Sequence, residues 1–399
     1  MSKENTLRLI LGDQLNYKHS WFQEELSSNI TYVMMEIRSE TDYAKHHIQK
    51  VMGFFAAMRE FKKHQENLGY KFIYIKLDDE NNKQDFAKNL DLIIKKEKIS
   101  VLEILEPDEY RLDQYFKKYL ETLDIDTQII DTEHFLSERN ELEDMFGKKD
   151  KYLMESFYRR MRKRYEILMS GDKPLNGKWN FDGDNRKKFP NVIEIPKHKT
   201  FRNDLDDIYT MIKKSDIKTI ASIKDPRSFE YPINREQSLQ VLNYFIDNLL
   251  VKFGDYQDAM SDNIEFGFHS RISFALNTKM LSPLEVVEKA EAKYKSGDAG
   301  IDISQVEGFI RQILGWREYM RSFYWVKMPG FAKTNFFDHD KQLPKFYWDA
   351  DTKMNCLKNC IQNSLDNAYA HHIQRLMITG NFALMAEVHP DEVDAREAD

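Results

Sequence analysis

The first third of the chain alternates short apolar segments with longer amphipathic ones, and this alternation limits the folds that the chain can adopt. The apolar segments are rich in β-branched and aromatic residues and are bounded by polar stretches, as buried strands are. The segments between them, such as Tyr43–His64 and Lys83–Lys98, have apolar residues at helical spacing. Strands connected by helices predict an α/β domain with a parallel, doubly wound sheet. We expect its five strands at Leu7–Leu11, Thr31–Ile37, Lys71–Leu77, Ser100–Leu105 and Thr127–Asp131.

A candidate site follows from this sheet, because ligands of parallel sheets bind beyond the carboxyl ends of the strands. Gly12, Asp13 and Gln14 follow the first predicted strand, and Glu36 lies at the end of the second. The chain has no G-x-G-x-x-G sequence, so a conventional dinucleotide fingerprint is absent.

The rest of the chain is expected to be mainly helical. From about Asn234 onward the long segments have a 3.6-residue period, as in Val241–Leu250 and Leu284–Tyr294. The less regular middle contains a basic helix, Lys151–Tyr165, with six Lys or Arg residues against one Glu. We therefore expect an α/β domain at 1–134, a linker with this basic helix at 135–232, and a helical domain at 233–399.

Composition excludes several classes of protein. A net charge of −7 argues against a uniformly basic nucleic-acid-binding protein, but it allows a local basic patch. No apolar run approaches the length of about 20 residues that spans a membrane, and the N-terminus lacks the apolar stretch of a secretory signal. Two cysteines in 399 residues do not form a disulfide framework, so we expect a cytoplasmic protein.

Two predicted helices of high polar density, Glu307–Trp325 and Asn367–Ala386, are the strongest functional signal. Their polar residues recur four apart, which places them on common faces. Charged side chains on otherwise apolar helices need partners, because burying an unpaired charge costs several kcal/mol. We expect a polar, non-protein group between these helices.

The segment HSRIS (His269–Ser273) is a second candidate, since Ser and His at a helix start suit an anionic phosphate. The alternative is that Ser270 and Ser273 only cap a helix. The adjacent His371 and His372 likewise have an alternative role in core packing or on a surface face.

Several motifs together resemble the photolyase/cryptochrome superfamily. They are LGDQL near the start, WNFD, FGDYQDAM, HSRIS, EGFIRQILGWREYMR, FYW (Phe346–Trp348), MNC (Met354–Cys356) and YAHHIQRLMITGNFAL. More narrowly, they look like the deoxyribodipyrimidine photolyase-related branch, which includes the iron–sulfur bacterial cryptochromes and the prokaryotic (6-4) photolyases.

The resemblance implies an N-terminal antenna domain and a C-terminal helical domain that holds FAD in a U-shape. By resemblance His269, Ser270 and Ser273 lie near the pyrophosphate of FAD. Glu307, Arg311 and Gln312 would face the flavin and the adenine. Arg375 would support the isoalloxazine ring, and Asn381 would contact flavin N5. The antenna of this branch, 6,7-dimethyl-8-ribityllumazine, would lie near Gly12, Asp13, Gln14 and Glu36.

The family chemistry is light-driven electron transfer from reduced FAD to a pyrimidine dimer in DNA. Repair of a (6-4) photoproduct also needs a proton donor, and histidine suits that role. By resemblance His372 faces the lesion, with His371 beside it. Trp316 would either stack on an extruded base or pack in the core. Trp348 matches a family tryptophan that transfers electrons.

UV-damaged DNA is the expected partner of a monomeric protein. We expect a basic surface around the flavin cavity, although a solvated helix face is the usual role of a charge run. Its predicted residues are Arg159, Arg160, Arg162, Lys163, Arg164, Arg317 and Arg321.

The iron–sulfur cluster of the family is the main departure. This branch holds a [4Fe–4S] cluster with four cysteines, of which Cys356 fits the first, whereas the other three positions lie beyond residue 399. Two thiolates, Cys356 and Cys360, cannot hold such a cluster. The acidic end, His389–Asp399, reads as a truncation, which predicts an unprotected apolar flank on Ile373–Val388 and low FAD occupancy. Three functions remain open: a (6-4) photolyase, a blue-light photoreceptor and an inactive remnant.

Overall fold

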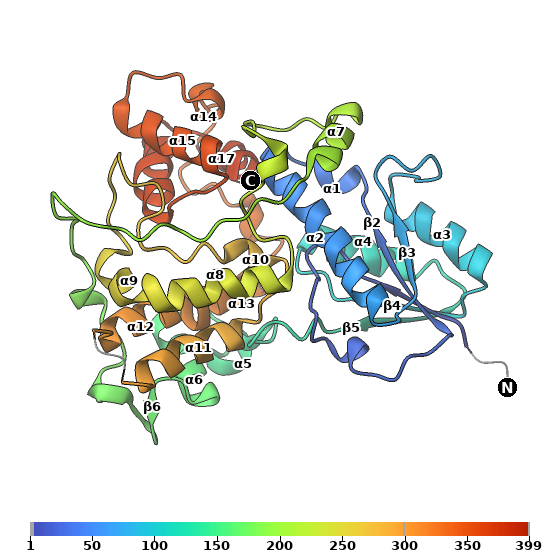
Figure 1. The fold of residues 1–399 in the computed structure, drawn as a ribbon, viewed down its shortest axis with the longest axis horizontal. Helices are drawn as coiled ribbons and strands as arrows, with labels where there is room; N and C mark the ends of the chain where they lie inside the picture. Colours follow the sequence, from blue (N-terminus) through green and yellow to red (C-terminus); the bar gives the residue numbers. More distant parts are fainter. Residues whose placement is uncertain (1–3, 298–299, 398–399) are drawn as a thin grey trace.

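The N-terminal region is built on a five-stranded parallel sheet (Figure 1). The structure, a computed structural model, describes residues 4–297 and 300–397. The predicted domain limits at residues 1 and 399, and the last two residues of the acidic end, lie outside this range. The strands, in the order β3-β2-β1-β4-β5, are β1 (Thr6–Leu9), β2 (Ile30–Met35), β3 (Phe72–Ile75), β4 (Val101–Leu105) and β5 (Asp126–Ile130). Every predicted strand is present and every neighbouring pair is parallel, so the predicted fold class is confirmed.

Helices cover both faces of the sheet, as a doubly wound fold requires. On one face Leu9 and Val33 belong to an apolar cluster with Phe86 of α3 and Phe116 of α4. On the other face Tyr32 packs into a second cluster that extends through α2 into the helical region. Side chains alternate between faces along a strand, so buried strands at the centre of the sheet carry apolar residues on both.

The helices are described together here. In the first half they are η1 (Ser20–Phe22), α1 (Ser39–Asp42), α2 (Ile48–Asn67), α3 (Phe86–Glu97), α4 (Tyr110–Leu120), α5 (Glu141–Phe146), α6 (Met154–Tyr165), η2 (Leu175–Gly177), η3 (Asp182–Asp184), α7 (Asp206–Lys214) and η4 (Pro226–Ser228). In the second half they are α8 (Arg235–Asn248), α9 (Leu250–Tyr256), α10 (Ser273–Asn277), α11 (Pro283–Lys295), α12 (Ile303–Ile310), η5 (Arg311–Arg317), α13 (Glu318–Lys327), η6 (Phe331–Lys333), α14 (Phe346–Asp349), α15 (Asn355–Asn367), η7 (Gln374–Gly380), α16 (Asn381–Met385) and α17 (Pro390–Glu397). A short hairpin, β6 (Met169–Ser170) and β7 (Lys173–Pro174), follows α6. Apart from isolated bridges, no strand occurs in the described residues beyond Asn234, as predicted.

Helix α2 joins the two regions, and a glycine makes the contact close. A Cβ atom on Gly53 would lie 3.2 Å from the ring of Phe274 and 3.3 Å from that of Phe229. These rings belong to α10 and to the segment before α8. The missing side chain therefore brings α10 against the sheet side of the molecule, where the cavities described below lie.

The first polar helix forms, whereas the second, predicted at Asn367–Ala386, is helical only from His372, because α15 ends at Asn367 and Ala368 has a left-handed conformation. Each helix contains one π-helical segment that periodicity did not predict. The first runs through α12, η5 and α13, and the second through η7 and α16. A π-helical turn rotates the side chains beyond it relative to an α-helix, and such turns are frequent at functional sites. The predicted four-residue spacing therefore does not keep all polar residues on one face.

The C-terminal helices form a separate small core around Tyr347, Leu357 and Ile361. One side of η7 and α16 is open to solvent: Leu376, Met377, Leu384 and Met385 are exposed by 52%, 50%, 49% and 76%. This side of the segment Ile373–Val388 is therefore apolar and exposed in the described chain. Among the described residues, no helix is both long enough and apolar enough to cross a membrane.

Candidate functional site

Two cavities lie where the carboxyl edge of the sheet meets the helical region. The larger has a volume of about 450 Å³ and is lined by α2, α10, the end of η5, α15 and the segments around them. The smaller, of about 240 Å³, lies between the ends of β1 and β2 and helix α2. Asp13, Lys50, Phe54 and Asp108 line both cavities and therefore form a wall between them.

The larger cavity has a cationic lining. Two carboxylates, of Asp13 and Asp108, face it together with five Lys and Arg side chains. These are Lys50, Arg271, Lys279, Arg317 and Arg396. An excess of fixed positive charge in a partly desolvated cavity favours an anionic ligand.

Arg271 is the clearest anion-binding candidate. It is buried, and its guanidinium lies over the rings of Phe266 and Tyr231, at 4.1 and 4.6 Å from their centroids. Within the described residues its Nε has no hydrogen-bond partner. Because buried donors are nearly always paired, this N–H fits a ligand acceptor such as a pyrophosphate oxygen. The donor set of the larger cavity therefore fits FAD.

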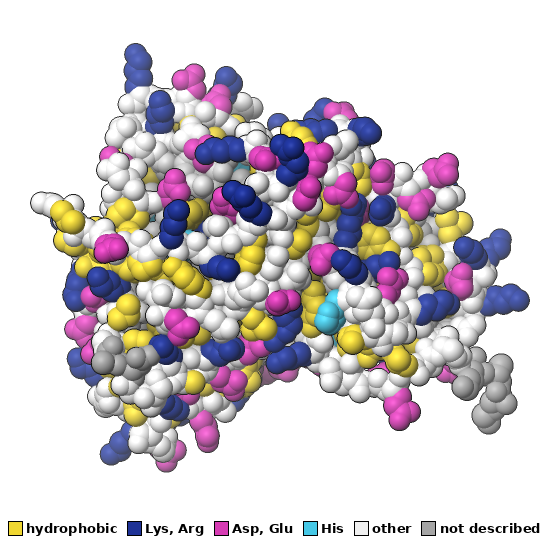
Figure 2. Space-filling view, in the orientation of Figure 1, with side chains coloured by type: hydrophobic (Ala, Val, Ile, Leu, Met, Phe, Trp, Pro, Cys, Tyr) yellow, Lys and Arg dark blue, Asp and Glu magenta, His cyan; other side chains and the backbone are white. Residues whose placement is uncertain are grey.

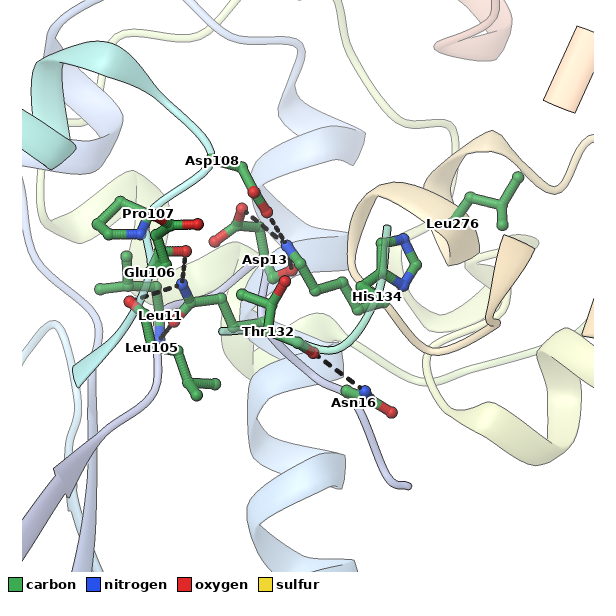
Figure 3. Close-up of polar contacts among 12 residues, drawn as sticks. Leu11, Asp13, Asn16, Leu105, Glu106, Pro107, Asp108, Thr132, His134 and Leu276 are labelled. Carbon is green, nitrogen blue, oxygen red and sulfur yellow. Dashed lines mark hydrogen bonds and ion pairs between the residues drawn. The ribbon is translucent and has the colours of Figure 1, made fainter. Parts of the chain in front are cut away.

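Lys279 links the sheet to the helical region through the shared wall, whose carboxylates Asp13 and Asp108 are labelled in Figure 3. Its ammonium lies 2.6 Å from Asp108 Oδ2 and 3.4 Å from Asp13 Oδ2, and it donates to the Asp13 carbonyl oxygen at 2.7 Å. Asp13 follows β1 and Asp108 follows the neighbouring β4, so their proximity results from the parallel pairing of these strands. Burial opposes the charged form of Lys279, but the two carboxylates outweigh it and raise its pKa.

The smaller cavity contains three of the four residues predicted for the antenna. Gly12, Asp13 and Glu36 line it, so the structure brings them together. The Glu36 carboxylate is already engaged by Arg59 at 2.7 Å and by the Tyr74 hydroxyl at 2.7 Å. Gln14 is buried and donates to the carbonyl oxygens of Leu105 and Glu106, so it fixes the loop after β1 instead of lining this cavity.

Two predicted histidines meet beside the larger cavity. His269 Nε2 lies 3.1 Å from His371 Nε2, and His371 Nδ1 accepts the backbone N–H of Ile373 at 3.2 Å. Burial lowers the pKa of His269 to about 3 and that of His371 to about 4. Both rings are therefore neutral at physiological pH. His372 points outward and is exposed, which leaves it accessible to a macromolecular substrate.

Glu307, Arg311 and Gln312 lie away from the larger cavity. Glu307 is fully buried and accepts hydrogen bonds from the Tyr158 hydroxyl and the Phe181 N–H, each at 3.0 Å. Arg311 pairs with Asp182 at 2.6 Å, and Gln312 donates to Gln257. None of the three lines the larger cavity. For Glu307 the geometry gives no support to a ligand contact, because both of its oxygens bond within the protein. Arg311 Nε, 3.5 Å from Glu307, has no hydrogen-bond partner in the described residues, so a ligand contact of Arg311 and Gln312 stays a prediction.

The remaining residues predicted for FAD are dispersed. Ser273 lines the larger cavity, whereas Arg375 lines a small neighbouring cavity of about 60 Å³ and Asn381 is exposed, donating to the Met377 carbonyl oxygen at 3.2 Å. Ser270 lines neither the larger nor the small neighbouring cavity. In the described chain no side chain caps the start of α10, so the capping alternative for Ser270 and Ser273 is wrong.

The basic helix α6 is only partly a surface feature. Arg162 is fully buried and donates to the carbonyl oxygens of Ile167, Leu168 and Trp179, so its predicted place on a DNA-binding surface is wrong. Arg159, Arg160, Lys163 and Arg164 are exposed, but Arg159 pairs with Glu155 and Arg164 with Glu141. Figure 1 places α6 at the opposite end of the helical region from α15 and α17, which contribute to the larger cavity. The face in Figure 2 intersperses basic and acidic side chains.

The remaining residues predicted to contact DNA, Arg317, Arg321 and Trp316, differ in their surroundings. Arg317 lines the larger cavity, where it lies 2.9 Å from His134 Nε2, while Arg321 bonds to the Ser137 carbonyl oxygen. Burial lowers the pKa of Arg317. Trp316 is 42% exposed, so it is not a core residue. It remains available for stacking.

The metal and electron-transfer predictions rest on α14 and α15. Cys356 and Cys360 are free thiols, and no group of three or more His, Cys, Asp or Glu residues with metal-binding geometry exists in the described ranges. With two cysteines in its sequence, the chain by itself does not fit a four-cysteine cluster. Trp348 lies in α14, with Arg396 5.5 Å from its ring.

Several basic and aromatic residues of the larger cavity were not predicted from the sequence, among them Arg271, Lys279, Tyr369 and Arg396. Arg271 lies inside the HSRIS motif, so its charge could have marked it as a phosphate ligand. Lys279 and Arg396 come from segments that converge only in the tertiary structure, and their sequence surroundings carry no signal of this.

Comparison with known proteins agrees with this architecture. A family model described as deoxyribodipyrimidine photo-lyase-related protein matches residues 8–227. The chain is 37% identical to a (6-4) photolyase of Agrobacterium fabrum over 392 residues, which are 97% of this chain and 76% of that protein. An uncharacterized protein of Acanthamoeba polyphaga mimivirus is 24% identical over 47% of the chain and 97% of its own length. A bacterial class III photolyase from Agrobacterium tumefaciens has the same fold, with a TM-score of 0.64, 12% identity and coverage of 99% of this chain and 76% of that structure. The chain belongs to the deoxyribodipyrimidine photolyase-related family.

Proposed function

We propose that this protein repairs pyrimidine (6-4) pyrimidone photoproducts in DNA in a light-driven reaction. The observation that carries the proposal is the 37% identity to a (6-4) photolyase along 97% of the chain. The cationic cavity supports it, because a flavin dinucleotide needs fixed positive charge around its pyrophosphate. When bound in this cavity, reduced FAD would supply the electron for light-driven transfer to the lesion.

The larger cavity binds FAD through residues that the described fold holds in place. Arg271 and Ser273 provide donors at the start of α10, and Arg317 adds a buried positive charge. Phe54 and Tyr369 provide apolar surface for a ring system.

His372 acts as the proton donor to the lesion. It is exposed, so an extruded base can reach it. Burial of part of its ring and the nearby Arg375 lower the pKa of His372, whereas Asp258 opposes this shift. A donor must be protonated, so the repair rate is expected to rise as the pH falls below 7.

The smaller cavity binds the lumazine antenna. Its position beyond β1 and β2 is that of ligand sites in doubly wound sheets. Glu40 and Tyr43 line it together with Asp13, and these groups can bond ribityl hydroxyls and ring nitrogens. The iron–sulfur cluster of the family has no part in the proposal, because the cysteines present do not fit it.

The direct test is repair of an oligonucleotide with a single (6-4) photoproduct. Protein loaded with FAD and reduced should restore the two pyrimidines under blue light and not in the dark, as followed by chromatography. An oligonucleotide with a cyclobutane dimer serves as the matched substrate control. Flavin-loaded protein that binds the lesion but leaves it intact under light would contradict the proposal and favour a photoreceptor.

A further inference from the structure

The wall between the two cavities is built from polar and apolar residues that both cavities share. Asp13, Lys50, Phe54 and Asp108 belong to the lining of both cavities. Any ligand that touches these residues from one side therefore fixes part of the surface that the other ligand meets.

A single buried cation holds this wall together. The Lys279 side chain is only 2% exposed, and its ammonium contacts both carboxylates and the Asp13 carbonyl oxygen. It enters from the helical region, directly after α10, whereas both carboxylates come from the sheet. Its backbone has a φ of +64° in the turn that ends α10, where its N–H donates to the Leu276 carbonyl oxygen at 3.2 Å.

The wall is incomplete in hydrogen bonding. Asp108 Oδ1 is buried and has no hydrogen-bond partner among the described residues, which marks an acceptor directed at a missing donor. One ammonium also faces two carboxylates. Burial raises the pKa of Asp13; the charge of Lys279 opposes this shift, and the charge of Asp108 adds to it. A ligand with hydroxyl or ring N–H donors would supply what the wall lacks.

We propose that Lys279 is a positioning residue that couples the two cavities, so that occupancy of either one by its ligand raises the affinity of the other. The first ligand orders the shared wall, and the second ligand then has a smaller ordering cost. This inference rests on the proposed assignment of FAD to the larger cavity and of a lumazine to the smaller one. By thermodynamic linkage, each ligand must change the affinity of the other by the same factor.

The test is a titration of the full chain, stripped of cofactors, with 6,7-dimethyl-8-ribityllumazine. Lumazine fluorescence gives its Kd without FAD and with saturating FAD, and FAD is titrated in the same way with and without lumazine. We expect both Kd values to fall by a common factor of about five or more. In Lys279→Met the two ligands should bind independently, so each Kd should be the same with and without the other ligand. Lys289→Met, which removes an exposed lysine on α11 that contacts Asn243, should leave the factor unchanged.

Each outcome separates the inference from the function on which it rests. Two ligands that bind wild type with unchanged Kd values would overturn the coupling while leaving the cofactor assignment intact. A factor of five that survives in Lys279→Met would show that the coupling does not pass through this residue. Absence of saturable lumazine binding would overturn the assignment of the smaller cavity, and the coupling with it. If Lys279→Met fails to fold, the wild-type titration still decides, and Asp108→Asn should reduce the factor.

Discussion

Replacement of Glu307 by alanine tests whether this residue stabilises the fold or contacts the flavin. The family resemblance assigns it to the flavin. In the structure Glu307 lies on α12 and is completely buried against α6 and the segment before η3. One oxygen accepts the Tyr158 hydroxyl and the other accepts the Phe181 N–H, each at 3.0 Å. Arg311 Nε approaches the carboxylate at 3.5 Å. The structure therefore predicts a loss of stability and no direct loss of flavin contact.

The size of the stability loss in Glu307→Ala follows from the buried donors that lose their acceptor. A buried donor left without an acceptor costs about 1–3 kcal/mol, and two such donors remain in Glu307→Ala. Arg311 keeps its ion pair with Asp182, so its contribution is smaller. We expect the free energy of unfolding to fall by about 3–5 kcal/mol, as for other broken buried pairs. Glu307→Gln retains an acceptor oxygen and should lose less.

Urea unfolding followed by tryptophan fluorescence measures this loss, and flavin fluorescence gives the FAD Kd of the variant under native conditions. Glu387→Ala, which removes an exposed carboxylate paired with Lys341, is the control and should unfold like wild type. Unchanged stability together with a tenfold weaker FAD Kd in Glu307→Ala would refute the structural role and restore the contact that the resemblance implies.

Three further outcomes are expected. His372→Ala should abolish light-driven repair and leave flavin content and DNA binding near wild type; loss of flavin would instead reveal a structural role. Lowering the pH from 7 to 4.5 should destabilise the fold, because unfolded His269 and His371 bind protons near pH 6.5 whereas the folded rings have pKa values of about 3 and 4. Their contribution is complete above pH 6.5 and declines by up to about 1.4 kcal/mol per pH unit for each ring, a slope absent in the double alanine variant. Charge reversal of Arg159 and Arg160 should weaken binding to damaged duplex and make the salt dependence shallower by about 0.9 per lost phosphate contact. Unchanged binding in a salt titration would show that α6 is only a solvated face.

The sheet could be predicted from the sequence because its signal is local. Each strand is a short apolar run between polar segments, and the rule that ligands bind at the carboxyl ends then located Asp13 and Glu36. The order of the strands decides which residue meets Asp13. Since β4 pairs with β1, this neighbour is Asp108, and no feature of the segment after β4 signals that contact.

Periodicity predicts that the second half of the chain is helical, but it does not predict which side of each helix faces a cavity. The family resemblance assigns Glu307 and Gln312 to the ligand, and their polarity on an apolar helix agrees with it. Polarity alone, however, does not distinguish a cofactor from a buried partner such as Tyr158 or Gln257. The π-helical turn at η5 adds a rotation that residue spacing does not contain. Arg162 shows the same limit, since a run of basic residues gives no sign that one of them binds three carbonyl oxygens in the interior.

The position of the two cavities explains why ligand binding and the contact between the regions depend on the same residues. Parallel pairing of β1 and β4 delivers two carboxylates to one edge of the sheet, and the helical region returns a single lysine to them. Leu15 adds a backbone bond across the same junction, donating its N–H to the Thr278 carbonyl oxygen at 2.9 Å. A substitution in this wall should therefore change ligand affinity and the packing of the two regions together. A substitution at Glu307, which lies within the helical region, should change stability alone.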